Sequence, residues 1–315
     1  MTTGSPVGFI GIGRLGLPLA SRLLDSGQAV VCCRRGRSDE LIAKGATIAG
    51  DGSARAVAQA AEVVFTCLTA EALEPVIAGE DGLLDAGGTA PLVVELSTAP
   101  TRQKARLREM LSERGGELLD CPVSGTPDMA AGGRAVVFAS GDRAAYERVA
   151  ALLAAISPGA TYVGELGAGT KMKYVANLLA TVHATVAAEA IAFAATIGLD
   201  LDTVVEVISR SPGATSGQFN ARAPMMAAEQ FDKKLVTVAE TRVVLDQIME
   251  VANESGASVP MVTTAKALFD EFADQGEDDS EPAKISLFLR GRGTGTMAAA
   301  AEQTESTDNA SLERT

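Results

Sequence analysis

Residues 8–16 read Gly8-Phe9-Ile10-Gly11-Ile12-Gly13-Arg14-Leu15-Gly16, and this GxGxxG stretch decides the fold of the first half of the chain. It follows an apolar run and opens an amphipathic one, as expected for a strand, a tight turn and a helix. Here Gly11 permits the turn, Gly13 lets backbone amides approach a pyrophosphate, and Gly16 lets helix and strand pack closely. Because the helix start also attracts phosphate, the stretch predicts a dinucleotide site containing Gly11, Gly13, Arg14 and Leu15.

The residues around and after this turn alternate short β-branched runs with amphipathic stretches, the pattern of consecutive βαβ units. We therefore predict an α/β Rossmann domain, a parallel doubly wound sheet covered by helices. The expected strands are Val7–Ile12, Ala29–Cys33, Val63–Leu68, Leu92–Leu96, Glu117–Cys121, Ala135–Ser140 and Thr161–Val163. The expected helices are Leu15–Asp25, Ser38–Lys44, Ser53–Ala60, Leu73–Ala78, Thr101–Glu113 and Arg143–Ala155.

Beyond Gly164 the pattern indicates helices only. Gly198 ends a long apolar helix, and Asp200 or Asp202 caps the next one. The expected helices are Ala168–Ile197, a segment ending near Arg210, Val236–Glu254 and Pro260–Gln275. The predicted organisation is a Rossmann domain at 1–165, an all-α domain with a long central helix at 166–290, and a disordered tail at 291–315.

Composition excludes several classes of protein. A formal net charge of −13 over 315 residues argues against nucleic-acid binding, which needs clustered Lys and Arg. Four cysteines without CxxC spacing and a single histidine argue against a metal site and favour reduced thiols in a cytoplasmic protein. The run Val7–Ile12 lacks the flanks of a secretory leader. Residues 174–198 are apolar enough for a membrane helix, but their His183 and Glu189 and the missing aromatic belt favour a helix buried within protein.

The end of the second predicted strand indicates which dinucleotide binds. An NAD site usually carries an Asp or Glu there, which holds the ribose 2′-hydroxyl. This chain instead has Cys32-Cys33-Arg34-Arg35-Gly36-Arg37-Ser38. Guanidinium groups and a hydroxyl suit a 2′-phosphate through charge-assisted hydrogen bonds. We therefore predict NADPH (NADP+) as the cofactor, held by Arg34, Arg35, Arg37 and Ser38.

Two further motifs accompany the glycine-rich turn. They are Asp120-Cys121-Pro122-Val123-Ser124-Gly125-Thr126-Pro127 and Gly164-Glu165-Leu166-Gly167-Ala168-Gly169-Thr170-Lys171-Met172-Lys173-Tyr174-Val175-Ala176-Asn177. With all three motifs in order over residues 7–260, the chain resembles the β-hydroxyacid dehydrogenases, such as 3-hydroxyisobutyrate dehydrogenases and glyoxylate/succinic semialdehyde reductases. The resemblance implies a hydride-transferring NAD(P)-dependent enzyme that acts on a small β-hydroxyacid or its semialdehyde.

Lys173 and Asn177 are the candidate catalytic residues. They lie four residues apart on one predicted helix, so they project from the same face. A carbonyl that accepts hydride needs a proton, which a lysine ammonium supplies; the neutral amine is the base in the reverse direction. The resemblance assigns this role to Lys173, and the Asn177 amide can hold the lysine or a substrate hydroxyl. Lys171 faces elsewhere, and His183 is not expected to be catalytic.

Other candidate residues follow predicted strands, at the carboxyl edge where such sheets bind ligands. Backbone amides and hydroxyls suit a substrate carboxylate at Ser124, Gly125 and Thr126. The resemblance places a second group near the nicotinamide, namely Leu68, Ser97 and Thr98.

The sequence departs from the family pattern in two places. Thr126, Met129 and Arg134 replace smaller residues in and after the second motif. Family members also carry a Lys-Asp pair in the second domain, where counting back from Gly256–Pro260 gives Val243-Val244. The reaction class is unaffected, but we expect a bulkier, less acidic or less strictly carboxylated substrate.

The long apolar helix also bears on assembly. A helix that is apolar on most faces is expected to be buried on all sides. With the family resemblance, this predicts a homodimer or homotetramer. Two alternative functions stay open: an imine (C=N) reductase, although such enzymes generally lack the lysine at position 173, and a non-catalytic NADPH-binding protein, which would need neither Lys173 nor Asn177.

Overall fold

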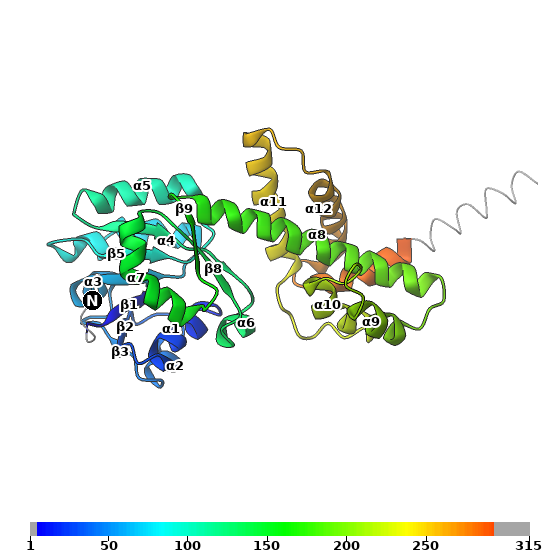
Figure 1. Ribbon diagram of the computed structural model, residues 1–315, viewed down its shortest axis with the longest axis horizontal. Helices are drawn as coiled ribbons and strands as arrows, with labels where there is room; N and C mark the ends of the chain where they lie inside the picture. The colour runs from blue at the N-terminus through cyan, green and yellow to red at the C-terminus, as the bar shows by residue number, and fades with distance from the viewer. Residues whose placement is uncertain (1–4, 293–315) are drawn as a thin grey trace, which may run out of the picture. The chain divides into compact units, whose positions relative to one another are not determined.

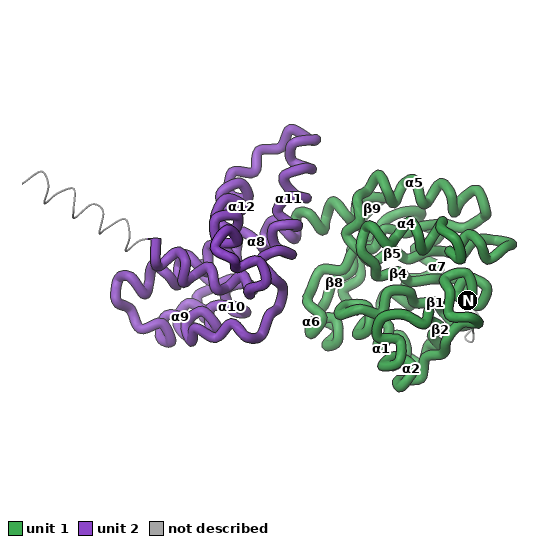
Figure 2. The backbone as a smooth tube through the Cα atoms, turned by 180° about the vertical axis from the view of Figure 1, so that it is seen from behind, with its two compact units in different colours: residues 1–175 green, residues 176–315 purple. Residues whose placement is uncertain are grey.

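The computed structural model describes residues 5–292 of the chain. The backbone divides into two compact units, residues 1–175 and 176–315, which Figure 2 colours separately. The division falls inside one continuous helix, α8 (Ala168–Thr196). The domain limits at 165/166 and 290/291 stay predictions. Gly291 and Arg292 are helical, and the rest of the predicted tail lies outside the described residues.

Unit 1 consists of strands surrounded by helices (Figure 1). Its sheet has the strand order β3-β2-β1-β4-β5-β6-β8-β7, and β9 pairs with β8. The strands from β3 to β6 are parallel, and the order reverses between β1 and β4. Open α/β sheets bind ligands beside such a reversal. The strands are β1 (Val7–Ile10), β2 (Val30–Cys32), β3 (Thr47–Ile48), β4 (Val63–Thr66), β5 (Leu92–Glu95), β6 (Glu117–Asp120), β7 (Val123–Ser124), β8 (Val136–Ser140) and β9 (Thr161–Gly164).

Side chains that alternate along the strands build two apolar cores, one on each face of the sheet. Phe9 belongs to the core that includes residues of α1, α2, α6 and α7, whereas Ile10 belongs to the core with α3, α4 and α5. The predicted Rossmann fold is confirmed. The helices of unit 1 before α8 are α1 (Gly16–Asp25), α2 (Ser38–Ile42), α3 (Ala54–Ala60), α4 (Ala70–Ala78), the 3₁₀ helix η1 (Leu83–Ala86), α5 (Thr101–Ser112), α6 (Pro127–Ala131) and α7 (Arg143–Ile156).

The far edge of the sheet is not parallel, because β8 runs antiparallel to β6. The cause is β7, which closely follows β6 and pairs antiparallel with β8. A strand that returns along its predecessor without a crossover must run in the opposite direction. Helix α7 then carries the chain across to β9, which is parallel to β8.

Unit 2 is all-α, as predicted. Asp200 caps α9 by accepting a hydrogen bond from the Thr203 amide at 2.9 Å, and Thr237 forms a capping box with Glu240 at the start of α11. Helix α10 was not predicted, because Pro224 and the Ser/Pro/Gly residues ahead of it indicate a loop. The elements after α8 are α9 (Leu201–Ser209), α10 (Gly217–Ala227), α11 (Val238–Ser255), α12 (Pro260–Phe272), η2 (Ala273–Glu277) and η3 (Pro282–Lys284).

Helix α8 is long and apolar enough to cross a membrane, with a mean hydropathy of 1.6 over its most apolar window. Only 39% of that window is buried within the chain. Leu179, Val186 and Phe193 expose 48%, 53% and 64% of their surface and recur every seven residues, so they form one stripe. A single chain therefore leaves this stripe exposed, and the expectation that α8 is buried on all sides, which included a second copy, stays a prediction.

A fully buried ion cluster joins three parts of unit 1. The ammonium Nζ of Lys104, on α5, lies 2.5 Å from Glu95 Oε2 and 2.7 Å from Asp120 Oδ1, and all three side chains are 0% exposed. Lys104 also donates to the Ser97 carbonyl at 2.7 Å. Asp120 accepts from the amide and the hydroxyl of Thr170, each at 2.8 Å. The cluster ties the ends of β5 and β6 to the first turn of α8.

The variant Lys104→Met is expected to lower the free energy of unfolding by about 3–5 kcal/mol, because it leaves two buried carboxylates without their cation. Urea denaturation measures this loss. The matched control is Lys171→Met, at an exposed lysine of α8, which should change stability by no more than about 0.5 kcal/mol. A loss below about 1 kcal/mol for Lys104→Met would show that the cluster does not stabilise the fold.

Candidate active site

The glycine-rich turn joins β1 to α1 and leaves open space at only one of its three glycines. Gly11 has φ +96°, and a Cβ on it would lie 2.2 Å from the Cys67 carbonyl oxygen. A Cβ on Gly16 would lie 1.9 Å from the Gly11 oxygen, whereas one on Gly13 would meet nothing within 4 Å. Gly11 and Gly16 are therefore required by packing. Gly13 is exposed at the start of α1, so the turn fits a pyrophosphate.

The basic loop after β2 lies against this turn. The Arg37 amide donates to the Ile12 carbonyl at 2.9 Å, which holds the loop beside the glycines. Arg34 and Arg35 are exposed and form no ion pair within residues 5–292. Arg37 pairs with Glu40, Nε to Oε1 at 2.5 Å, and Ser38 is 4% exposed. Of the four predicted residues, Arg34 and Arg35 are thus the best placed for a 2′-phosphate.

The residues predicted near the nicotinamide follow β4 and β5, the two strands next to β1 on one side. Leu68 contacts the glycine-rich turn, since a Cβ on Gly11 would lie 3.0 Å from its Cδ2. Ser97 is held through its backbone, because its amide donates to Glu95 Oε1 at 2.8 Å and its carbonyl accepts from Lys104. Thr98 is half-buried beside it. These residues line the carboxyl edge of the sheet, where ligands bind.

The predicted substrate segment follows β6. Ser124 lies in β7, and Gly125 has φ +149° and no room for a side chain, since a Cβ would lie 2.9 Å from Ala135 Cβ. The Thr126 hydroxyl accepts a hydrogen bond from the Met129 amide at 3.3 Å and caps α6. Its role is therefore structural at least in part. Ser124 and Gly125 are the better candidates for a substrate carboxylate.

The catalytic candidates lie on α8, with Lys173 in unit 1 and Asn177 one turn further along in unit 2. Burial lowers the pKa of the Lys173 ammonium to about 8, and within residues 5–292 no carboxylate forms an ion pair with it. A group with this pKa exchanges protons readily near neutral pH. Lys171 and His183 are exposed, and their positions suggest no part in the site.

The cysteines are poor candidates for chemistry. All four are free thiols. Burial raises the pKa of Cys67 to about 12 and that of Cys33 to about 11, so neither forms a thiolate readily. Among residues 5–292 no group of three His, Cys, Asp or Glu side chains is arranged to hold a metal ion.

Sequence reasoning missed the ion cluster beneath these residues. Lys104 shares the buried face of α5 with Leu107 and Leu111, three and seven residues on. A lysine at that spacing indicates a buried, paired cation. Its partners were not identifiable from the spacing, since Thr170 is 66 residues away in sequence.

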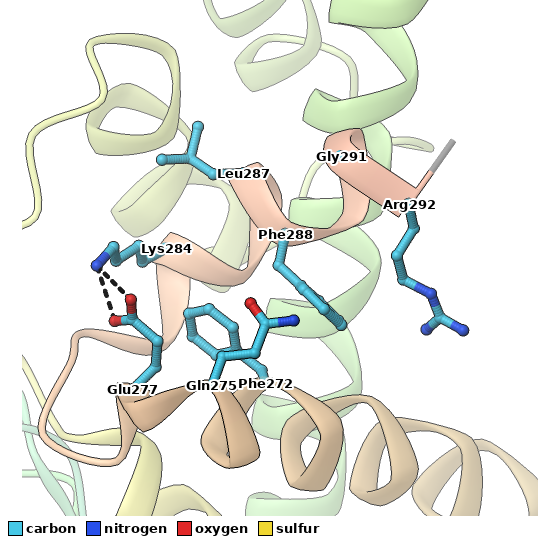
Figure 3. Close-up of a pocket in the computed structure, with 8 residues that line it drawn as sticks. All are labelled: Phe272, Gln275, Glu277, Lys284, Leu287, Phe288, Gly291 and Arg292. Atoms are coloured by element: carbon cyan, nitrogen blue, oxygen red, sulfur yellow. Dashed lines mark hydrogen bonds and ion pairs between the residues drawn. The ribbon is translucent and has the colours of Figure 1, made fainter. Parts of the chain in front are cut away.

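Unit 2 contains a cavity of about 500 Å³ whose wall includes none of the predicted site residues. Figure 3 shows Phe272 and Phe288 in its wall beside Lys284, which pairs with Glu277 at 2.7 Å. Arg292, the other charged residue of the wall, pairs with Glu271 at 3.0 Å, so the charged groups that line the cavity are compensated and offer no free charge for a substrate. It does not compete with the carboxyl edge of the sheet as the candidate site.

The fold and the glycine-rich turn define a class, the dinucleotide-binding oxidoreductases with a Rossmann unit followed by helices. Residues 6–164 match the family described as the NAD binding domain of 6-phosphogluconate dehydrogenase. Residues 167–288 match that described as NAD-binding of NADP-dependent 3-hydroxyisobutyrate dehydrogenase. The chain belongs to the β-hydroxyacid dehydrogenase family and is an NAD(P)-dependent oxidoreductase, as its resemblance implied.

Curated relatives and solved structures agree with this assignment. L-threonate dehydrogenase of Cupriavidus necator is 32% identical over 286 residues, 89% of this chain and 95% of its own. NAD-dependent L-serine dehydrogenase of Pseudomonas aeruginosa is 31% identical, covering 86% of this chain and 93% of its own. The crystal structure of 3-hydroxyisobutyrate dehydrogenase from Salmonella typhimurium has a TM-score of 0.80 at 25% identity, covering 90% of this chain and 100% of that one.

An imine reductase from Myxococcus stipitatus shares the architecture, with a TM-score of 0.58 at 18% identity over 90% of this chain and 99% of that one. At this identity the likeness shows the fold alone. The fold therefore does not separate a carbonyl reductase from an imine reductase, and the distinction depends on the residues of the site.

The contrast between Gly13 and Gly16 can be tested by substitution. Gly13→Ala should fold normally but weaken dinucleotide binding about tenfold or more, because the methyl group enters the space left for the pyrophosphate. Gly16→Ala should lose stability, because its Cβ meets a backbone oxygen. Calorimetric titration and thermal unfolding measure the two effects. Unchanged affinity in folded Gly13→Ala would place the pyrophosphate elsewhere.

Proposed function

We propose that the chain is an NADPH-preferring oxidoreductase that transfers a hydride between the nicotinamide and a small β-hydroxyacid or its semialdehyde, with Lys173 as general acid and base. The observation that carries the proposal is Lys173 itself. It is a half-buried lysine on the helix that the family motif marks, and desolvation lowers its pKa to about 8. A lysine placed for structure alone would be exposed or paired with a carboxylate.

The nicotinamide, when bound, supplies or accepts the hydride. Protonated Lys173 donates its Nζ proton to the carbonyl oxygen during reduction, and neutral Lys173 removes the hydroxyl proton during oxidation. The ammonium also stabilises negative charge that develops on the oxygen. Asn177, one turn along α8, presents an amide that can hold the lysine or the substrate hydroxyl.

The preference for NADPH rests on the loop after β2. Arg34 and Arg35 are exposed beside the glycine-rich turn and unpaired within residues 5–292, so their guanidinium groups are available to a 2′-phosphate. Asp39 and Glu40 follow at the start of α2, and Glu40 is already neutralised by Arg37. One of the relatives above is named as NAD-dependent, so this loop rather than the fold would decide the cofactor.

The substrate is proposed to be a small molecule that carries a carboxylate. The names of the relatives denote L-threonate and L-serine, both small hydroxy acids. Ser124 and Gly125 supply a hydroxyl and backbone amides for such a group. Val243 and Val244 stand where family members carry Lys and Asp, and Val243 is 56% exposed. Because that lysine is absent here, we infer that the enzyme depends less strictly on a carboxylate in its substrate.

We further propose a cytoplasmic homodimer or homotetramer. Four free thiols, three of them buried, fit a reducing compartment. The stripe Leu179, Val186 and Phe193 on α8 is the apolar surface that a second copy would cover. Coverage by a second copy would also explain why a helix of this hydropathy is only 39% buried in one chain.

The role of Lys173 is tested by following NADPH oxidation with glyoxylate, succinic semialdehyde, tartronate semialdehyde and methylmalonate semialdehyde. Lys173→Ala should lower kcat at least about 100-fold while NADPH affinity stays the same. Reduction needs the protonated lysine, so kcat should be constant below about pH 8 and fall above it, and oxidation should show the opposite trend.

The control for this assay is Lys171→Ala, at the exposed lysine two residues earlier, which should keep wild-type rates. Full activity of Lys173→Ala would contradict the proposal, and turnover of imines alone would favour the C=N reductase. Uncarboxylated aldehydes in the same assay test the substrate. Strict dependence on a carboxylate would contradict the weaker requirement inferred from Val243-Val244.

Cofactor choice is tested with the double variant Arg34→Ala/Arg35→Ala. Its affinity for NADPH should fall about 10- to 100-fold, because two charge-assisted hydrogen bonds to the 2′-phosphate are lost, while affinity for NADH should change by less than about twofold. Arg143→Ala, at an exposed arginine of α7, is the control. Equal wild-type affinity for NADH and NADPH would rule out the preference.

Assembly is tested by placing a charge on the stripe. Val186→Glu or Phe193→Glu should shift the protein toward monomer in sedimentation at micromolar concentration, since a buried unpaired carboxylate is costly. Ala144→Glu, at an exposed position of α7, should leave the assembly intact. A wild-type protein that sediments as a stable monomer would overturn the proposal.

A further inference from the structure

One buried ammonium group touches three segments that carry residues of the proposed site. Lys104 Nζ lies 2.7 Å from the Ser97 carbonyl, at the segment that continues into Thr98. It lies 2.7 Å from Asp120 Oδ1, at the start of the segment that leads to Ser124. The Thr170 hydroxyl, in the first turn of α8, is 3.2 Å away.

Several hydrogen bonds connect the cluster to α8. Asp120 accepts from both the amide and the hydroxyl of Thr170 at 2.8 Å. Ser140 donates from its hydroxyl to Asp120 Oδ2 at 3.1 Å and accepts from the Gly169 amide at 2.9 Å. Thr170 precedes Lys173 by three residues, so the cluster holds the turn of α8 from which Lys173 projects.

The charge state of the cluster suits a fixed support rather than a proton carrier. Burial opposes the charge of Lys104, but Glu95 and Asp120 outweigh this effect and raise its pKa above the usual value. A lysine ammonium has three protons to donate, and here they go to the Ser97 carbonyl, Asp120 Oδ1 and the Thr170 hydroxyl, while Glu95 Oε2 lies 2.5 Å from the same nitrogen. Lys104 therefore stays protonated and has no proton to exchange with a substrate.

We propose that Lys104 is a positioning residue that, through Asp120 and Thr170, fixes Lys173 relative to Ser97 and the 120–124 segment. The inference rests on the proposed function, because it assigns to those segments the residues that meet cofactor and substrate. Lys104 itself touches neither. It acts by holding the groups that do, and small displacements of such groups slow a reaction strongly.

The test uses Thr170 first, because Lys104→Met is expected to destabilise the fold. Thr170→Val keeps the shape of the side chain and removes the hydroxyl, while Thr170→Ser keeps the hydroxyl. In the full-length enzyme with NADPH, Thr170→Val should lower kcat about tenfold or more, with KM and NADPH affinity within about twofold of wild type. Thr170→Ser should restore kcat to within about threefold.

A second variant removes the charges together. Lys104→Met/Glu95→Gln/Asp120→Asn leaves no uncompensated buried ion, so it should fold. It should still show the loss in kcat with little change in NADPH affinity. Wild-type kcat in either Thr170→Val or the triple variant, with only a lower unfolding temperature, would overturn the proposal and leave a purely structural role.

Hydrogen exchange separates this inference from the proposed function. In Thr170→Val and in the triple variant, amides of residues 97–99 and 168–173 should lose protection together, whereas Thr170→Ser should keep it. If wild-type enzyme turns over none of the substrates above, the proposed function fails, and the exchange data still decide whether the cluster couples the segments. A change of hydrogen exchange in only one of these two segments would overturn the proposed coupling between them.

Discussion

The arrangement of unit 1 depends on the compensation of two buried carboxylates by one lysine. Removing Glu95 and Asp120 from water is costly, and the cost is met only when a cation and several hydrogen-bond donors surround them. The donors are Lys104 on α5, the Ser97 amide two residues after β5, the Ser140 hydroxyl in β8, and Thr170 in the first turn of α8. A displacement of any of these segments would leave a polar group unsatisfied. This requirement holds the carboxyl edge of the sheet in one geometry.

The sequence was sufficient for the elements whose pattern is local. The βαβ alternation and the long apolar helix predicted the Rossmann unit and the helical unit, and most element ends fall within three residues of expectation. The two-residue strands β3 and β7 and the five-residue helix α6 are too short for periodicity to appear. The antiparallel direction of β8 follows from β7, so the sequence pattern did not indicate it either. Helix α10 contains Pro224, which ordinarily indicates a loop.

Residues of the candidate site were predictable where the residue type has a single structural use, as glycine has in a tight turn. Gly11, Gly13 and Gly16 were assigned separate roles, and the space around each agrees with them. Where a side chain has competing partners, the sequence was less informative. The Thr126 hydroxyl caps α6, and Ser38 is buried at the start of α2. The ion cluster of Lys104 was missed because Asp120 and Thr170 are 16 and 66 residues away from it in sequence, and only the fold brings them together.

The position of Thr170 has a consequence for how the chain folds during synthesis. The match to the NAD-binding family ends at residue 164, where the last strand of the sheet is complete. Gly169 and Thr170, which donate to Ser140 and Asp120, come later. A nascent chain that has emerged only to residue 164 therefore holds every strand of this sheet, but its buried Asp120 keeps only Lys104 and Ser140 as donors and lacks the amide and hydroxyl of Thr170. The hydrogen bonding of this buried aspartate is complete only once the first turn of α8 has joined the sheet, so the boundary of the nucleotide-binding half lies beyond its last strand.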